Sequence, residues 1–226
     1  MSISRHKICF VISNIKLGGA ERQFVKIINS LDKNLFDINL LIYSFNGKIP
    51  FKINNYITIN KINKDNYSQF KFIKVIQSLY YLRNFFYKNK FDLIQTTLFI
   101  NSTILRLALP NFYKNKVLGT IRTTSYKWWQ YFFEYILIKG SYLITNSEFV
   151  YQKLLKIKTF NSKIFYIANG FEIVKENIVN IDNKNIRIST VGRFSSEKNQ
   201  IFLIKAFSEL KNNNLKLILF GTKGDE

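Results

Sequence analysis

Cysteine and histidine are nearly absent from this chain of 226 residues, and each shortage excludes a kind of protein. The single cysteine, Cys9, stands in an apolar run, so a disulfide framework is excluded and a reducing compartment, the cytoplasm, is expected. The single histidine, His6, is flanked by basic residues and has no cluster of Cys, His or Asp beside it in the sequence. That setting predicts a solvent-exposed side chain rather than a metal ligand.

Long hydrophobic runs are missing as well. No apolar stretch approaches the ~18 residues that a membrane-spanning helix needs, and the aromatic stretch 128–138 is interrupted by Gln130 and Glu134. The N-terminus leads directly into a short strand pattern and lacks the apolar region and cleavage site of a secretory signal. We therefore expect a protein that neither spans a membrane nor is exported.

Acidic residues are scarce: 14 Asp and Glu stand against 34 Lys and Arg, which gives a formal net charge of +20. Three interpretations are open. The whole chain is rich in Lys, Asn, Ile, Phe and Tyr, a bias typical of an AT-rich genome, and the excess charge also suits an anionic membrane surface. Nucleic acid is the weakest of the three, because the basic residues are dispersed and form no run of five.

What the chain does have is a regular alternation of strand and helix patterns, built from 47% hydrophobic residues. Short apolar runs predict strands covered on both faces, and the apolar stripes between them predict helices. The expected strands are at residues 7–12, 38–43, 56–59, 92–96, 117–121, 142–145, 164–167, 187–191 and 215–220, and the helices at 21–31, 68–87, 100–109, 128–138, 148–155 and 200–210. This order predicts an α/β fold with a doubly wound parallel sheet.

The same pattern suggests two domains. Residues 1–175 form the first, residues 176–185 are polar and rich in Asn and make a linker, and residues 186–226 hold one strand–helix–strand unit. A lone unit of this kind buries too little apolar surface to be stable alone. We therefore expect residues 186–226 to be the beginning of a second domain of a longer protein.

Polar clusters follow several of the expected strands, where open α/β sheets bind anions at helix N-termini. Gly18 and Gly19 follow the first strand. They either let a ligand approach the backbone closely or form a tight turn with positive φ. Glu21 is either part of the site or an ordinary first-turn charge, and Arg122 either binds an anion or forms a structural salt bridge. Asn169 and Gly170 fit a turn as well as a ligand site.

The last cluster, residues 191–199 (Val-Gly-Arg-Phe-Ser-Ser-Glu-Lys-Asn), resembles the opening of the second domain in the family 4 glycosyltransferases, which have the GT-B fold. In that family a strand is followed by Gly-Arg and then by Lys five residues after the Arg, as Arg193 and Lys198 are here. Residues 17–22, 143–148 and 163–171 are similar to three further family motifs, in the same order. Four weak motifs in register make the resemblance strong.

The resemblance implies two Rossmann-like domains that bind a nucleotide-diphosphate sugar, with retention of anomeric configuration and the acceptor on the N-terminal domain. Arg193 and Lys198 would stabilise the departing diphosphate, and Gly18 and Gly19 would approach it from the first domain. No Asp-x-Asp occurs, so neither a metal ion nor another cofactor is expected. Arg122 stands where many relatives place His, and Arg cannot act as a base.

Other interpretations follow from the same residues. The chain could be an inactive acceptor-side remnant that binds saccharide or membrane, because the carboxylate pair that the resemblance expects in the second domain would come after Glu226. Residues 68–87 form a basic amphipathic pattern that fits either a membrane surface or an ordinary packed helix. The aromatic stretch 128–133 could line a groove for a lipid-linked acceptor or belong to an interdomain core. We expect a cytoplasmic protein at the inner face of the plasma membrane.

Overall fold

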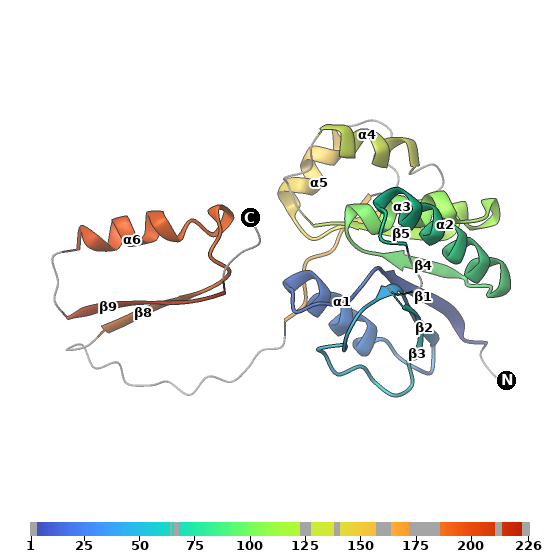
Figure 1. Cartoon of the computed structure of the whole chain (residues 1–226), viewed down its shortest axis with the longest axis horizontal. Helices are drawn as coiled ribbons and strands as arrows, with labels where there is room; N and C mark the ends of the chain where they lie inside the picture. The colour runs from blue at the N-terminus through green and yellow to red at the C-terminus, as the bar shows by residue number, and fades with distance from the viewer. Residues whose placement is uncertain are drawn as a thin grey trace. The chain divides into compact units, whose positions relative to one another are not determined.

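The computed structural model describes residues 4–63, 65, 68–122, 128–137, 141–156, 164–171, 186–210 and 214–222. The chain divides into two compact units, Met1–Phe171 and Glu172–Glu226 (Figure 1). The linker expected at residues 176–185 lies outside the described residues.

A seven-stranded parallel sheet forms the centre of the first unit, with the order β3-β2-β1-β4-β5-β6-β7. Its strands are β1 (His6–Ile12), β2 (Phe36–Phe45), β3 (Thr58–Asn63), β4 (Leu93–Thr96), β5 (Val117–Ile121), β6 (Tyr142–Thr145) and β7 (Ile164–Tyr166). Between them lie α1 (Gly19–Ser30), α2 (Lys71–Lys88), α3 (Phe99–Ala108), the 3-10 helix η2 (Asn111–Lys116), α4 (Trp128–Leu137) and α5 (Glu148–Leu155). The α/β fold with a parallel sheet is therefore confirmed.

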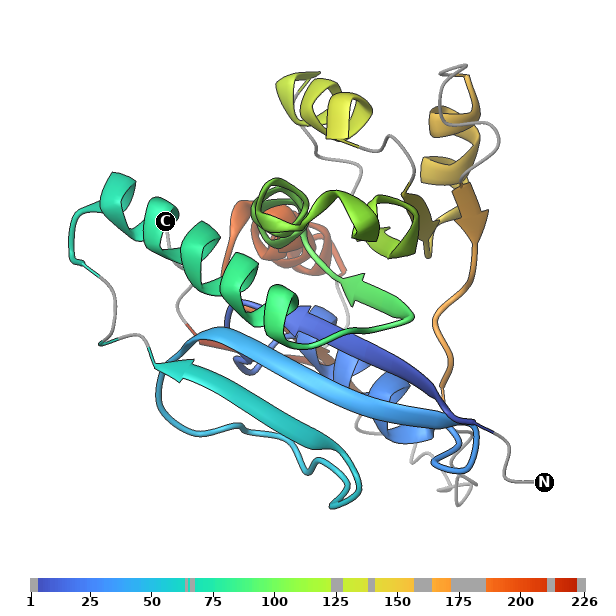
Figure 2. The ribbon, with the colours of Figure 1, turned by 90° about the vertical axis from the view of Figure 1, so that its right-hand side faces the viewer.

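Alternation along β1 explains why both faces of the sheet are covered. Successive side chains of a strand point to opposite faces, so Cys9 and Val11 join one buried cluster while Phe10 and Ile12 join the other. The first cluster includes Leu82 and Phe86 of α2 and Leu105 and Ala108 of α3, and the second includes Phe24, Val25 and Ile28 of α1. Figure 2 shows α2 and α3 on one side of the sheet and α1 on the other. Burial raises the pKa of the Cys9 thiol, as expected for a cysteine that acts as a small apolar core residue.

The strand order reverses between β1 and β4, which are hydrogen-bonded neighbours in the sheet. From β1 the chain continues outward through β2 to β3, and from β4 it continues outward through β5 to β7. In open α/β sheets ligands bind outside the carboxyl ends of the strands at such a reversal, because the connecting loops separate there. The sheet order therefore points to the loops after β1 and β4.

The second unit consists of β8 (Ile186–Val191), the 3-10 helix η4 (Ser196–Lys198), α6 (Gln200–Ser208) and β9 (Leu215–Phe220). Its two strands pair in parallel, with Ile186 opposite Leu215 and Val191 opposite Phe220. A Cβ on Gly221 would collide with the backbone carbonyl of Gly192, so a glycine is needed where the chain leaves β9. The pairing of β8 with β9 holds their ends together, and glycine permits the close approach there.

The observed elements differ from the expected ones mainly at their ends. The helix expected at 68–87 begins at Lys71 and ends at Lys88. The strand expected at 56–59 is Thr58–Asn63, because this edge strand pairs with β2 from Asn39 opposite Thr58 to Phe45 opposite Asn63, with a shift of register between Ile42 and Phe45. In α4, Trp129, Phe132 and Phe133 are each at least 39% exposed, so they are not part of the core of the first unit. The acceptor groove and the interdomain core stay predictions for this stretch. None of the helices that the structure describes is long and apolar enough to cross a bilayer.

Candidate functional site

Two cavities lie at the carboxyl edge of the seven-stranded sheet, on either side of the loop that joins β1 to α1. Ser13, Asn14 and Lys16 of this loop line a cavity of about 770 Å³, which we call the switch-point cavity. Residues Leu17 and Gly18, together with the first turn of α1, line a cavity of about 590 Å³, which we call the arginine cavity. One short loop therefore separates two sites of the size that small ligands occupy.

The arginine cavity collects the loops that follow four strands of the sheet. Its lining residues are Leu17, Gly18, Gly19, Ala20, Arg22, Gln23, Arg122, Asn146, Asn169 and Phe171. Four of the residues expected from sequence therefore meet at one cavity: Gly18, Gly19, Arg122 and Asn169. They come from the ends of β1, β5 and β7, which the sheet order brings to the same edge.

Arg122 directly follows β5 and reaches the start of α1. Its Nη1 donates a hydrogen bond to the carbonyl oxygen of Ala20 at 3.3 Å, and its Nε is buried with no hydrogen-bond partner. Burial lowers the pKa of the guanidinium, while the charge of Glu21 acts in the opposite direction. A buried cation with an unused donor is costly unless an anion completes it, so this position suits a phosphate or carboxylate.

The start of α1 adds a second source of positive potential to this cavity. Gly18 is the N-cap of α1 and offers no side chain to the unpaired first-turn N–H groups. A Cβ on Gly18 would meet the flexible Glu21 carboxylate, whereas a Cβ on Gly19 would meet nothing within 4 Å. The space at Gly19 is therefore open to a ligand, and the helix dipole favours an anion there.

The explanation of Gly18 and Gly19 by a positive φ is wrong. Gly18 has φ −138° and ψ 160°, an extended conformation that any residue adopts. Of the described glycines, Gly47 is the one with positive φ, at 78°. What distinguishes Gly18 and Gly19 is the absence of a side chain at the cavity, not a strained backbone.

Two asparagines complete the rim of the arginine cavity. Asn146 follows β6, and its Oδ1 is buried without a hydrogen-bond partner. Asn169 follows β7 and is half-buried at the cavity, while its neighbour Gly170 is exposed and lies outside the lining. Asn146 was not among the residues expected from sequence, although its place directly after a strand is the signal that identified Arg122.

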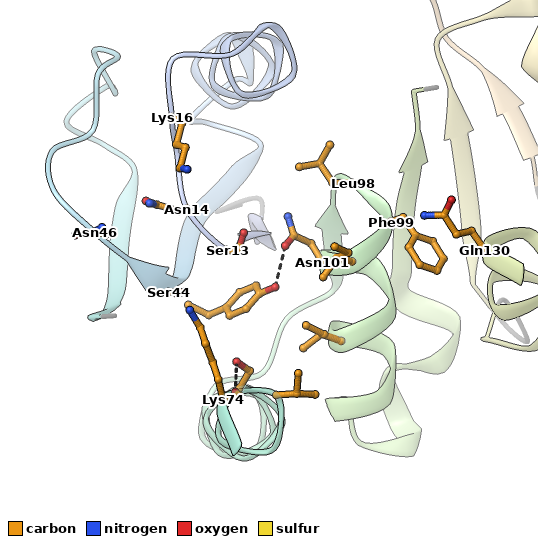
Figure 3. A pocket seen from close by; sticks show the side chains of 15 residues that line it. Ser13, Asn14, Lys16, Ser44, Asn46, Lys74, Leu98, Phe99, Asn101 and Gln130 are labelled. Carbon is orange, nitrogen blue, oxygen red and sulfur yellow. Dashed lines mark hydrogen bonds between the residues drawn. The ribbon is translucent and has the colours of Figure 1, made fainter. Parts of the chain in front are cut away.

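The switch-point cavity was not expected from sequence. Its lining residues are Ser13, Asn14, Lys16, Tyr43, Ser44, Asn46, Lys74, Val75, Ser78, Leu98, Phe99, Ile100, Asn101, Ile104 and Gln130. Figure 3 shows Asn14 and Lys16 on one side of it and Leu98 and Phe99 on the other. The first side is therefore polar, while the second is apolar at Leu98 and Phe99 and also carries Asn101 and Gln130, an arrangement suited to an amphipathic ligand.

Two consecutive buried hydrogen bonds fix side chains in the wall of this cavity. The Tyr43 hydroxyl donates to Asn101 Oδ1 at 2.8 Å (Figure 3), and Asn101 Nδ2 donates to the Thr97 carbonyl at 3.0 Å. Between Thr97 and α3 stands Leu98, which has φ 71° and ψ 142°. This conformation is unfavourable for a branched side chain, and it places a strained residue at the wall of the cavity.

Arg193 and Lys198 lie in the second unit, in the loop that joins β8 to α6. Both side chains are exposed, and the loop is anchored because Gln200 Nε2 donates to the Arg193 carbonyl at 2.7 Å. The Lys198 side chain passes close to Gly192, where an added Cβ would lie 3.7 Å from its Cγ. The two cations thus stand at the carboxyl edge of β8, next to the N-terminus of α6.

Metal-ligating side chains do not gather anywhere in the described part of the chain: no group of three His, Cys, Asp or Glu is close enough to hold an ion. His6 is exposed on the first residue of β1, as its sequence setting predicted. The polar groups available at the two cavities are cations, amides, hydroxyls and backbone N–H groups, which are suited to anions and sugar hydroxyls.

Comparisons with known proteins identify the family and the fold of the chain. The family model of Glycosyltransferase Family 4 matches residues 17–175. Among curated proteins none matches the chain. The chain is similar to the apo form of the lipopolysaccharide outer core galactosyltransferase WaaB, at 13% identity and a TM-score of 0.64, over 97% of this chain and 62% of that one.

It is also similar to WaaG, a glycosyltransferase involved in lipopolysaccharide biosynthesis, at 12% identity and a TM-score of 0.62. That match covers 94% of this chain and 62% of WaaG. The chain therefore spans about 62% of the length of both structures. At these identities the likeness shows the fold, which is of the GT-B type.

Proposed function

Because the chain belongs to glycosyltransferase family 4, we propose that it transfers a sugar from a nucleotide-diphosphate sugar to an acceptor hydroxyl. The observation that carries this proposal is the arginine cavity, where a partly buried guanidinium and the open N-terminus of α1 face the same space. A diphosphate leaving group gains negative charge as the sugar departs, and preorganised cations and N–H groups stabilise that charge.

For the donor we propose that the diphosphate lies in the arginine cavity. Arg122 would donate from its unpaired Nε, and Gly19 would let a phosphate oxygen approach the first turn of α1. In the second unit we propose Arg193 and Lys198 as phosphate-binding residues, with a bidentate fork from the first and a point charge from the second. Glu21, Asn169 and Gly170 would play secondary roles around the same ligand.

The acceptor in this proposal occupies the switch-point cavity. Its polar wall offers hydroxyl and amide groups of Ser13, Asn14 and Ser44 to a saccharide, and its apolar wall offers Leu98 and Phe99 to a lipid chain. The loop from β1 to α1 separates this cavity from the arginine cavity, so donor and acceptor would meet across one short segment. A saccharide or a lipid-linked saccharide is the acceptor class that fits both walls.

We propose that the reaction retains the anomeric configuration and needs no metal ion. The bond between the anomeric carbon and the diphosphate oxygen breaks, the acceptor oxygen bonds to that carbon, and the acceptor proton passes to the departing phosphate. Arg122 is charged and takes no proton, so it stabilises the diphosphate while the phosphate itself serves as the base. The chemistry is then complete without a carboxylate pair holding Mg²⁺.

The biological setting that we propose is the synthesis of a cell-surface polysaccharide or lipopolysaccharide on the cytoplasmic side of the plasma membrane. The likeness to WaaB and WaaG supports this setting, since WaaB is a lipopolysaccharide outer core galactosyltransferase and WaaG is a glycosyltransferase involved in lipopolysaccharide biosynthesis. The chain has 34 basic and 14 acidic residues, and this excess of positive charge supports a location beside anionic lipid.

Two measurements on the 226-residue chain test the proposal. Calorimetry should detect binding of one of UDP, GDP or ADP, and the matching sugar nucleotides should release nucleoside diphosphate when a saccharide acceptor is added. Release that depends on the acceptor supports a transferase. Binding without release would instead identify an acceptor-side module that does not catalyse transfer, and absence of both would reject the proposal.

A further inference from the structure

Two lysines line the switch-point cavity from different elements. Lys16 lies in the loop that joins β1 to α1, and Lys74 lies on α2. Figure 3 shows both side chains pointing toward the polar side of the cavity, where Asn14 and Ser44 lie. The described lining contains no Asp or Glu, so every charged side chain that the structure places there is positive.

The two positive charges share one hollow of the protein surface. Low-dielectric walls focus the potential of such charges into the cavity, which raises the local concentration of anions. Two ammonium groups that face the same space also repel each other, and an anion bound to both replaces this repulsion with two attractions. Lysine binds phosphate as a compact point charge. The lysine pair therefore favours a phosphate group in this cavity.

Neutral groups beside the lysines are arranged as hydrogen-bond donors. The Oδ1 of Asn14 accepts a hydrogen bond from the Ile15 N–H at 2.9 Å, which leaves the Nδ2 group of Asn14 to donate to a ligand. The Ser44 N–H donates to the Ser13 carbonyl at 2.8 Å, so the ends of β1 and β2 are tied together beside the cavity. The hydroxyl groups of both serines add further donors. Phosphate oxygens are acceptors, and a wall of donors suits them.

The apolar part of the lining shows that the ligand is larger than a phosphate ion. Leu98, Phe99, Val75 and Ile104 line the same cavity, and the Phe99 ring packs edge to face on Trp129 with 5.5 Å between the ring centres. Inorganic phosphate would leave this apolar surface in contact with water. A phosphate ester covers it with its organic part, either a hydrocarbon chain or the apolar face of a sugar ring.

We propose that Lys16 and Lys74 form an anion subsite that holds a phosphate group of the acceptor. The acceptor is then a phosphate ester, either a saccharide joined to a lipid through phosphate or a phosphorylated saccharide. That the ligand is an acceptor rests on the proposed function, in which the donor diphosphate lies in the arginine cavity. The anion subsite itself requires neither donor nor transfer.

Calorimetric titration of the 226-residue chain with two pairs of probes tests the subsite. Geranyl phosphate and geraniol share a hydrocarbon chain, glucose 1-phosphate and glucose share a sugar ring, and one member of each pair lacks the phosphate. In at least one pair the phosphate ester should bind about tenfold or more tightly than its neutral partner, and raised NaCl should weaken that binding. Tighter binding of geranyl phosphate identifies a lipid phosphate as the source, and tighter binding of glucose 1-phosphate identifies a phosphorylated saccharide.

Substitution of the lysines tests which groups hold the phosphate. Lys16→Gln and Lys74→Gln should each weaken binding of the tighter phosphate ester by about tenfold or more, because a hydrogen bond to a charged group is lost. Lys16→Arg keeps the charge and should keep most of the affinity. Lys16 is exposed, so its variants test the subsite without a change in thermal stability.

The matched control is Lys26→Gln combined with Lys88→Gln. Both lysines are exposed, lie on α1 and α2 respectively, and are outside the described lining of both cavities. This control removes as much charge as replacing Lys16 and Lys74 together, and it should leave the affinity for the phosphate ester unchanged. Arg122→Gln should leave it unchanged as well, because Arg122 lines the arginine cavity.

Three results overturn the subsite: phosphate esters that bind no more tightly than their neutral partners, equal losses in the lysine variants and their control, and a loss caused by Arg122→Gln alone. The titrations contain no sugar nucleotide, so their result is separate from the transfer assay. Phosphate binding without transfer leaves the subsite standing and counts against the proposed reaction. Transfer to a neutral saccharide that is unaffected by replacing both Lys16 and Lys74 leaves the reaction standing and overturns the subsite.

Discussion

Arg122 and Ala20 are 102 residues apart in sequence, yet the guanidinium of the first donates to the carbonyl of the second at 3.3 Å. The contact ties the loop after β5 to the first turn of α1 across the carboxyl edge of the sheet. It holds one Nη in place while the buried Nε has no hydrogen-bond partner. The guanidinium is thus positioned by the protein and still has a donor available for a ligand.

Replacing Arg122 with Gln should weaken nucleoside diphosphate binding by roughly 10- to 100-fold, because a hydrogen bond to a charged group contributes about 1.5–3 kcal/mol. Calorimetric titration measures the change. Arg5→Gln is the matched control, since Arg5 Nη1 also donates to a backbone carbonyl, that of Lys33 at 3.4 Å, but lies outside the arginine cavity. Equal effects of the two substitutions would remove Arg122 from the site.

Gly19→Val should leave the fold intact and block the ligand. An added Cβ at Gly19 meets nothing within 4 Å, and valine has a higher helix propensity than glycine, so the thermal midpoint should not fall. Nucleoside diphosphate affinity should drop by about tenfold or more, since the side chain fills the approach to the first-turn N–H groups.

Gly47→Val provides the contrast to that variant. Gly47 has φ 78°, so a β-branched residue there should lower the thermal midpoint while ligand affinity is retained. If Gly19→Val bound the nucleotide as tightly as the unaltered chain, the space at Gly19 would have no role in binding.

The conformation of Leu98 predicts that, at this position, a glycine variant is more stable than an alanine variant, the reverse of the usual order. Leu98→Gly and Leu98→Ala both remove the side chain, but at φ 71° alanine keeps the steric strain and glycine does not. The glycine variant should therefore be the more stable by about 1 kcal/mol, although glycine is usually the less stable of the two in helical positions. Urea unfolding of the two variants measures the difference, and a more stable alanine variant would show that Leu98 is unstrained.

Arg193→Ala should reduce sugar transfer by roughly 100-fold, the usual effect of removing a preorganised donor from a developing negative charge. The side chain is exposed, so the second unit should keep its stability. Arg187→Ala serves as the control because Arg187 is exposed on β8 in the same unit, before the loop begins. Near-normal transfer by the Arg193 variant would exclude it from the reaction.

Particular residues show why the secondary structure could be predicted. The run from Ile8 to Ile12 is apolar at every position because β1 is buried on both faces, and a continuous run of this kind is recognisable without neighbours. The ends of α2 and β3 were harder to predict. For β3 the reason is that its pairing with β2, at the edge of the sheet, sets which residues form the strand. Arg122 could be picked out because it directly follows a strand, and Gly18 because it lies in the loop between a strand and the helix that it caps, but their roles in binding stay predictions.

The amino-acid sequence by itself determined the alternation of strands and helices, the parallel sheet and the loops that carry polar groups, because these depend on residues close together in the chain. Tertiary structure alone decided which loops meet. Arg122 reaches Ala20, and Tyr43 reaches Asn101, because the strand order reverses beside β1 and brings distant strand ends to one edge. Tertiary structure also decided that Phe72, Ile76 and Tyr80 of α2 are exposed, because the packing of α2 on the sheet sets which of its two apolar faces is buried.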